Sequence, residues 1–169
     1  TPGYPDFLGQ GIGGLQGVDN AAIVINAQSG IEVNTRRVID EAGKAGVGRI
    51  IVINKMDAEN IEFNELNSSI QEMWGPMSVL LNVPIGHGPD FKGVVSTLKV
   101  PDDSTGALTD PAEIHEPLLE SIIEVDEEVM ERYFEGTEPT PEELSRLIVR
   151  AVREGSLVPI VCCSAILGT

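Results

Sequence analysis

The chain has 169 residues, which allows one domain with a sizeable core or a domain with a large insert. Its formal net charge of −16 excludes a broad, sequence-independent grip on nucleic acid, because phosphate contact needs Lys and Arg, so we expect no DNA partner. The sequence shows no signal peptide, membrane span or lipidation signal, so we expect no membrane partner and a cytoplasmic location.

The first half of the chain alternates strand and helix patterns. The sequence predicts a loose glycine-rich helix over 9–14, a strand over 21–26, a helix from 34 or 35 to about 45, a strand over 50–53 and a helix from 63 to near Gly75. Apolar, β-branched strands that alternate with amphipathic helices imply a parallel sheet with right-handed crossovers. The predicted fold class is therefore α/β.

The pattern changes after Pro76. Strands are predicted over 79–83 and 93–100, with a turn-rich link over 86–90 and a polar surface loop over 101–111. A helical face then runs from 118 to 133, with a break that Asp126 caps. Thr140, Pro141 and Glu143 form a capping-box start for a helix that ends at Gly155. A last apolar strand, from 158, contains the adjacent Cys162 and Cys163, which we expect to be buried free thiols.

Asn54, Lys55, Met56 and Asp57 follow the strand predicted over 50–53, and this tetrapeptide is the most informative feature of the sequence. The carboxyl ends of parallel strands are where open α/β sheets bind ligands. A carboxylate such as Asp57 can accept two parallel hydrogen bonds from a guanine ring N–H and its exocyclic amine, whereas adenine lacks that donor pair. The stem of Lys55 can lie over the flat base, and the amide of Asn54 can tie neighbouring loops together. The alternative is that Asp57 caps a helix that begins near Ala58.

Two further stretches match the same chemistry. Gly3, in the opening Thr-Pro-Gly, allows close backbone approach to a phosphate. Ser164 and Ala165 form a turn after the last predicted strand.

With these motifs, the chain resembles a translational GTPase of the elongation factor G type. The resemblance rests on T-P-G-Y-P-D-F over 1–7, A-Q-S-G-I-E-V-N-T over 27–35, N-K-M-D over 54–57, F-K-G-V-V over 91–95 and D-E-E-V-M-E-R-Y-F-E-G over 126–136. It implies a truncated phosphate-loop GTPase fold formed by 1–78 and 156–169, with an inserted α+β subdomain over 79–155. It also implies that Gly3 contacts the terminal phosphate and that the backbone N–H of Ala165 reaches the guanine carbonyl.

The same resemblance implies GTP or GDP as ligand, with Mg²⁺ in the full-length parent. The 169 residues contain no Gly-x-x-x-x-Gly-Lys-Ser/Thr phosphate loop and no first switch segment that we can place, so we expect a piece of a longer protein that is itself inactive. No metal-ligand set stands out in the sequence. The implied partner is the ribosome, with the insert contacting the stalk protein and only local contact with ribosomal RNA.

Tyr4 departs from the family pattern. The residue after Pro-Gly is usually a His that orients the attacking water, and a phenol cannot act as the same charged group. The resemblance as a whole still predicts a GTPase that couples hydrolysis to translocation or a related ribosomal step. The alternative is a non-hydrolysing GTP-binding paralogue, or an interaction module that uses the insert to bind a ribosomal partner.

Overall fold

The computed structural model describes residues 5–169. The helices are α1 (Leu8–Leu15), α2 (Val33–Lys44), α3 (Phe63–Trp74), α4 (Pro111–Ile123), α5 (Glu127–Phe134) and α6 (Pro141–Glu154), with short 3₁₀ turns at Pro5–Phe7 and Gly88–Asp90. The strands are β1 (Asn20–Asn26), β2 (Gly48–Asn54), β3 (Ser78–Leu80), β4 (Asn82–Ile85), β5 (Gly93–Ser96) and β6 (Val158–Cys162). Secondary structure follows the predicted order closely.

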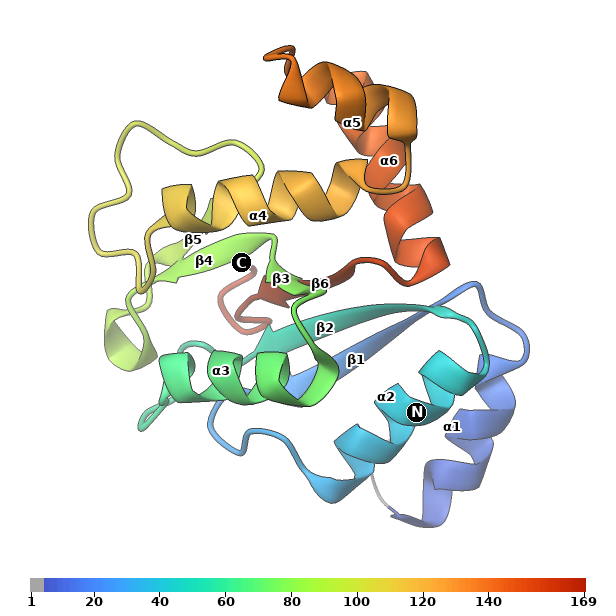
Figure 1. Cartoon of the computed structure of the whole chain (residues 1–169). Coiled ribbons are helices and arrows are strands. Elements are labelled where there is room, and N and C mark those ends of the chain that lie inside the picture. Colours follow the sequence, from blue (N-terminus) through green and yellow to red (C-terminus); the bar gives the residue numbers. More distant parts are fainter. Residues whose placement is uncertain (1–4) are drawn as a thin grey trace.

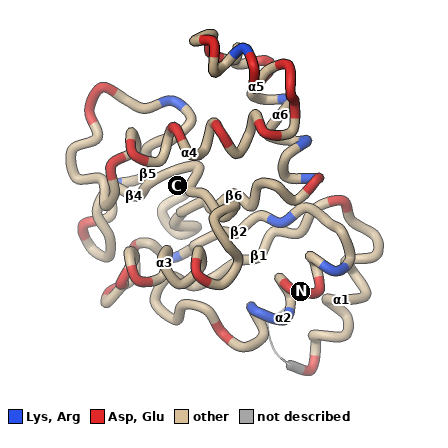
Figure 2. Tube along the Cα trace, in the orientation of Figure 1, with Lys and Arg blue, Asp and Glu red and all other residues tan. Residues whose placement is uncertain are grey.

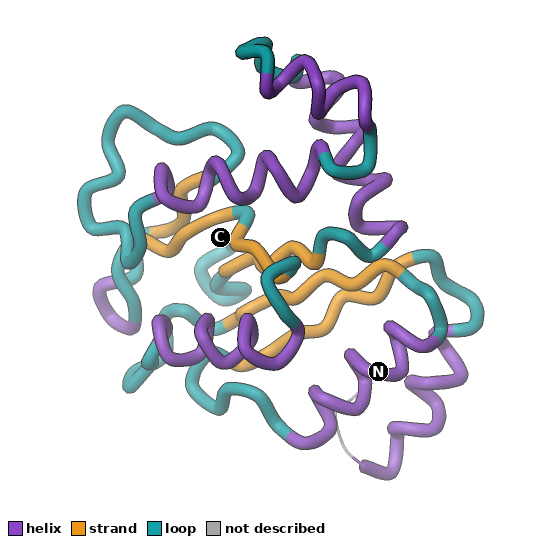
Figure 3. The backbone as a smooth tube through the Cα atoms, viewed as in Figure 1, coloured by secondary structure: helices purple, strands orange, loops and turns teal. Residues whose placement is uncertain are grey.

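A four-stranded parallel sheet in the order β1-β2-β6-β3 forms the centre of the molecule. Helices α1, α2 and α3 lie on one side of it and α4, α5 and α6 on the other (Figures 1 and 3). The α/β fold class, with a parallel sheet flanked by helices, is confirmed. Since all four strands are parallel, their carboxyl ends lie at the same end of the sheet, where residues 54–57 and 164–165 are found.

Each face of the sheet has its own apolar core. Alternate residues of a strand point to opposite faces, so Ile51 and Ile53 of β2 pack with α2 and α3, whereas the half-buried Ile50 packs with the cluster of α4 and α6. The central strand is therefore apolar on both sides, as its continuous β-branched run predicted.

The segment predicted as one strand over 79–83 is two strands in different sheets. β3 pairs with β6 in the parallel sheet, whereas β4 pairs with β5 as an antiparallel hairpin. Leu81 lies between them, with its N–H donated to Ile160 O (2.9 Å) and its C=O accepting from Thr97 N (3.1 Å). An unbroken apolar run does not reveal where a chain changes sheets, because both strands need apolar residues.

Two other predicted boundaries move. The strand predicted over 93–100 ends at Ser96. The next residue, Thr97, still donates its N–H to Leu81 O, and its hydroxyl donates to Leu80 O (2.6 Å). β3 also crosses the expected domain boundary after residue 78, since its three residues belong to the parallel sheet. The division into an α/β domain and an insert over 79–155 remains an expectation.

The helices between residues 111 and 154 have the caps that the sequence predicted. Asp126 is the N-cap of α5 and accepts a hydrogen bond from Val129 N (3.3 Å). Thr140 and Glu143 form a reciprocal capping box at the start of α6, and Gly155 ends that helix in the left-handed conformation. Acidic residues outnumber Lys and Arg along α4 and α5, whereas α6 carries equal numbers of Glu and Arg (Figure 2). Among residues 5–169, no helix combines the length and apolar character that a membrane crossing would need.

Candidate functional site

The loops that follow β2 and β6 lie side by side, because these strands are parallel neighbours with Ile53 opposite Cys162. Cys163, the first residue after β6, donates its N–H to Ile53 O (2.9 Å). On the other side, Ala27 after β1 donates its N–H to Asn54 O (2.9 Å). Residues 54–57, which we call the base loop, are thus held between the ends of two neighbouring strands.

Asn54 ties the base loop to the turn formed by residues 164 and 165. Its Oδ1 accepts hydrogen bonds from Lys55 N (2.7 Å) and Ala165 N (3.0 Å), and the thiol of Cys163 lies 3.6 Å away. One side-chain oxygen therefore fixes both its own loop and the turn from the neighbouring strand. This confirms that the Asn54 amide joins the two loops, as its chemistry predicted.

Lys55 has φ +67°, a left-handed conformation that is uncommon for any residue other than glycine. Its carbonyl accepts from Ala58 N (3.0 Å), and Met56 N donates to Cys163 O (3.2 Å). The resulting sharp bend buries Met56 completely and leaves the side chain of Lys55 exposed. Strain of this kind persists only where the surroundings over-determine the conformation, and it clusters at functional sites.

Asp57 does not cap a helix, because α3 begins at Phe63 with Glu62 as its N-cap residue. The alternative interpretation of Asp57 is therefore wrong. Its Oδ1 instead accepts a hydrogen bond of 2.5 Å from the hydroxyl of Ser164. Ser164 is itself fully buried and exchanges two backbone hydrogen bonds with Thr169 (3.0 and 3.1 Å). A fixed hydroxyl thus orients a half-buried carboxylate.

Ala165 lies at the exposed surface of the turn, but its N–H already donates to Asn54 Oδ1. A guanine carbonyl at this position would share or replace that bond. The remaining chemistry fits a purine base: the carboxylate of Asp57 accepts hydrogen bonds only, and the apolar stem of the exposed Lys55 can cover a ring. Gly3 and Tyr4, the predicted phosphate contact and catalytic position, lie outside the described residues.

The family model of the elongation factor Tu GTP binding domain matches residues 1–169. The chain belongs to that family. The family is one of GTPases that bind guanine nucleotides.

A crystal structure of a protein from Thermus thermophilus is similar to this member of the elongation factor Tu GTP binding domain family. The TM-score is 0.83 at 28% sequence identity, and the match covers 97% of this chain. It covers 26% of the Thermus protein, so this chain spans about a quarter of that protein's length. The similarity therefore extends over residues 79–155 as well as the parallel sheet.

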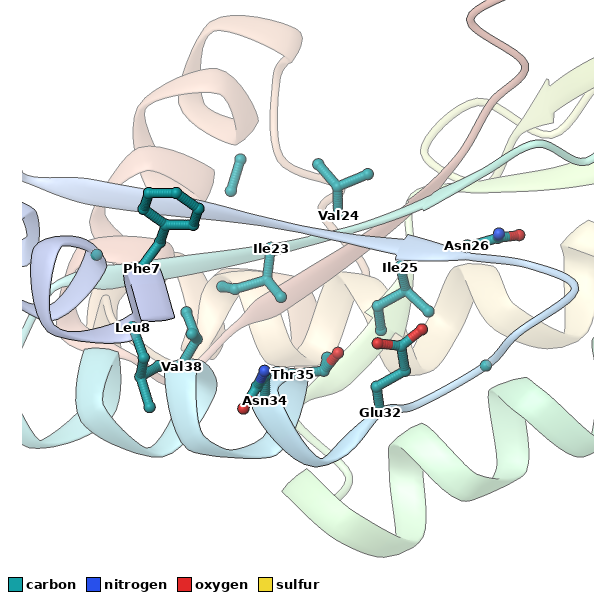
Figure 4. A pocket seen from close by; sticks show the side chains of 13 residues that line it. Phe7, Leu8, Ile23, Val24, Ile25, Asn26, Glu32, Asn34, Thr35 and Val38 are labelled. Atoms are coloured by element: carbon teal, nitrogen blue, oxygen red, sulfur yellow. The ribbon is translucent and has the colours of Figure 1, made fainter. Parts of the chain in front are cut away.

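A pocket of about 340 Å³ lies along the edge strand β1, between α1 and the start of α2. Figure 4 shows Ile23 and Ile25 of β1 on the same side as Glu32, Asn34 and Thr35 of the α2 region. None of its lining residues belongs to the base loop or the turn. This pocket is therefore distinct from the predicted base site.

The two cysteines differ in their surroundings. Burial raises the pKa of the Cys162 thiol to about 12, with the neighbouring Cys163 as a second cause. Cys163 lies one residue beyond β6, is only half-buried, and has a pKa raised by burial. The expectation that both thiols are buried is wrong for Cys163, because the strand ends before it. Both are free thiols.

No group of three or more His, Cys, Asp and Glu side chains within residues 5–169 is arranged to hold a metal ion. Two residues of the β4–β5 hairpin beside the site were not predicted from the sequence. Asn82 hydrogen-bonds to Cys162 at the end of β6, and Gly88 hydrogen-bonds to Met56 of the base loop. The only available signal was the glycine-rich turn over 86–90, which was interpreted as a simple link.

Proposed function

We propose that this chain is the guanine-recognising part of a ribosome-associated translation factor of the elongation factor G type. The observation that carries the proposal is the hydrogen bond between Asp57 and Ser164, made by two loops that Asn54 also joins. It presents an oriented, half-buried carboxylate at the carboxyl edge of a parallel sheet. Such a group selects a base that offers two adjacent N–H donors.

Guanine would lie with its ring N–H and exocyclic amine on Asp57 and one ring face on the stem of Lys55. Its carbonyl would face Ala165 N. Adenine presents neither the donor pair nor the carbonyl, so Asp57 and Ala165 would both disfavour it. Asn54 acts as a positioning residue, since its Oδ1 is satisfied by two backbone N–H groups.

We further propose that a longer protein of this family carries the chain, and that its other residues bind the phosphates and Mg²⁺. Within this chain, the backbone of Gly3 would approach the terminal phosphate. Bound GTP supplies the terminal phosphoryl group, and the proposed reaction is attack of water on that group. We propose that the longer protein couples this hydrolysis to translocation or a related ribosomal step in the cytoplasm.

The insert is the part proposed to contact the ribosome. Its exposed acidic residues along α4 and α5 suit a basic protein surface, and they favour the stalk protein over broad contact with ribosomal RNA (Figure 2). Any contact with ribosomal RNA would be local. The strong salt dependence of an electrostatically steered complex gives a direct check on this surface.

Nucleotide discrimination in the longer protein tests the proposal directly. We expect GDP to bind and ADP to bind at least about a hundredfold more weakly, because ADP cannot satisfy Asp57. Calorimetric titration with each nucleotide measures the ratio. Equal affinities for GDP and ADP would overturn the assignment of this site.

A substitution at Tyr4 distinguishes a hydrolysing GTPase from a non-hydrolysing GTP-binding paralogue. If Tyr4 occupies the water-orienting position, Tyr4→His raises ribosome-stimulated GTP hydrolysis by about 10²–10⁴-fold with little change in GTP affinity, because the contact forms only in the transition state. Turnover measured with and without ribosomes decides this. A matched fall in GTP affinity would show that Tyr4 only packs the surrounding segment.

A further inference from the structure

The β4–β5 hairpin contacts the base loop and the end of β6, the strand that leads into the turn. Asn82, at the start of β4, reaches the end of β6 just before the turn, and Gly88, between β4 and β5, reaches the base loop. We propose that Asn82 and Gly88 are positioning residues that hold the base loop against the turn. The consequence for guanine recognition rests on the proposed function, whereas the positioning itself does not.

Asn82 completes the sheet where a strand is missing. β3 pairs with β6 only as far as Leu80 and Ile160, so the backbone of Cys162 extends beyond the end of its neighbour. The Asn82 side chain supplies both missing partners: its Oδ1 accepts from Cys162 N (2.7 Å) and its Nδ2 donates to Cys162 O (3.2 Å). Unpaired backbone groups at this half-buried place would cost free energy, so the amide fixes β6 two residues before Ser164.

Gly88 supports the base loop from the other side. Its N–H donates to Met56 O (2.8 Å), and a Cβ at this position would lie 3.2 Å from Ala58 O. Gly88 also has φ +60°, which side chains rarely adopt. A side chain at this position would be both strained and tightly packed, so glycine suits the close approach of the hairpin backbone to the loop.

Met56 connects these contacts to the core. It is fully buried in the same cluster as Val83 of β4 and Phe91, which follows the Gly88–Asp90 turn. Met56 also donates its N–H to Cys163 O, which belongs to the loop after β6. Hairpin, base loop and turn thus form one packed unit, and displacement of the hairpin would separate the carboxylate of Asp57 from the N–H of Ala165.

Amide hydrogen exchange of the 169-residue chain tests the positioning without any nucleotide. The reporters are Met56 N–H and Ala165 N–H, which each join the base loop to the turn or its preceding residue. We expect Gly88→Ala and Asn82→Ala to raise the exchange rates of these two amides about tenfold. Amides in the β1–β2 ladder should change little, because only the contact between base loop and turn opens.

Two control variants separate positioning from general destabilisation. Gly46→Ala imposes a similar backbone cost, since Gly46 has φ +70°, but nothing lies within 4 Å of its Cβ position. Ser156→Ala removes another part-buried side-chain bond to the backbone, the one to Ala151 O, away from the hairpin. Neither control should raise exchange at the reporters above that of the ladder. Equal effects of Gly88→Ala and Gly46→Ala, or uniform acceleration throughout the sheet, would overturn the proposal.

Nucleotide titration of the longer protein then gives the functional consequence. Asn82→Ala should lower the ratio of GDP to IDP affinity, since inosine lacks the exocyclic amine that Asp57 would bind. A loss of stability alone would weaken the binding of GDP and of IDP by the same factor. Discrimination between GDP and ADP in the unmutated protein tests the proposed function separately, so failure of that function and failure of the positioning give different results.

Discussion

Replacement of Asp57 by Asn removes one charge and changes the hydrogen bonds that the base site offers, with almost no change in side-chain volume. The Asn oxygen can still accept the hydroxyl of Ser164, which now holds Asp57 Oδ1 at 2.5 Å. We therefore expect the fold and the turn to survive. The second position of the side chain becomes an NH₂ donor where the carboxylate offered only an acceptor.

The expected magnitude follows from the bonds that are lost. A hydrogen bond to a charged group contributes about 1.5–3 kcal/mol, so the loss of one such bond lowers affinity for GDP about 10- to 150-fold. Xanthine has a carbonyl where guanine has its exocyclic amine, and the new NH₂ can donate to it. Preference should therefore shift from GDP towards XDP in the mutant.

Calorimetric titration of the longer protein with GDP and with XDP measures both effects. Glu59→Gln is the matched control, because Glu59 is exposed two residues from Asp57 and undergoes the same change of charge. It should leave both affinities within about twofold, as expected for a screened surface charge. Unchanged GDP affinity in Asp57→Asn would refute the base-binding role and leave Asp57 as a partner of Ser164 only.

Three further predictions concern the 169-residue chain itself. We expect it to bind GDP weakly or not at all, because its sequence contains no phosphate loop to hold the phosphates; a submicromolar dissociation constant by calorimetry would contradict this. Thr140→Ala should lower the free energy of unfolding by about 1 kcal/mol through loss of the bond from Glu143 N (3.2 Å), whereas Thr137→Ala, in the same exposed loop, should not; urea titration measures both. At pH 8, iodoacetamide should modify half-buried Cys163 well before Cys162, because Cys162 is buried and its pKa of about 12 keeps its thiol protonated. Mass spectrometry that shows the reverse order would refute this burial pattern.

Local sequence signals predicted most of the fold because each depends on residues close in the chain. The capping box of Thr140 and Glu143 lies within four residues and predicted where α6 begins, and Gly155 predicted where it ends. The continuous apolar run of β2 predicted a strand buried on both faces. The position of the base loop at the strand end followed from the same run, since the polar residues begin where the strand stops.

Features that depend on distant segments were not predicted. The apolar stretch that contains β3 and β4 gave no sign that Leu81 separates a parallel sheet from an antiparallel hairpin, because pairing partners decide that. The partner of Asp57 was also misjudged in the alternative interpretation: a nearby helix start was considered, but the actual partner, Ser164, is far away in the chain.

The sequence by itself determined the chemistry of the site: an amide at Asn54, a carboxylate at Asp57 and a small hydroxyl at Ser164, each just after an apolar strand. The tertiary structure decided how these groups meet. Parallel pairing of β2 with β6 brings Asn54 to Ala165, and the left-handed bend at Lys55 buries Met56. Support from Asn82 and Gly88 could come only from the fold, because a single Asn and a single Gly acquire these roles when the hairpin packs beside the sheet.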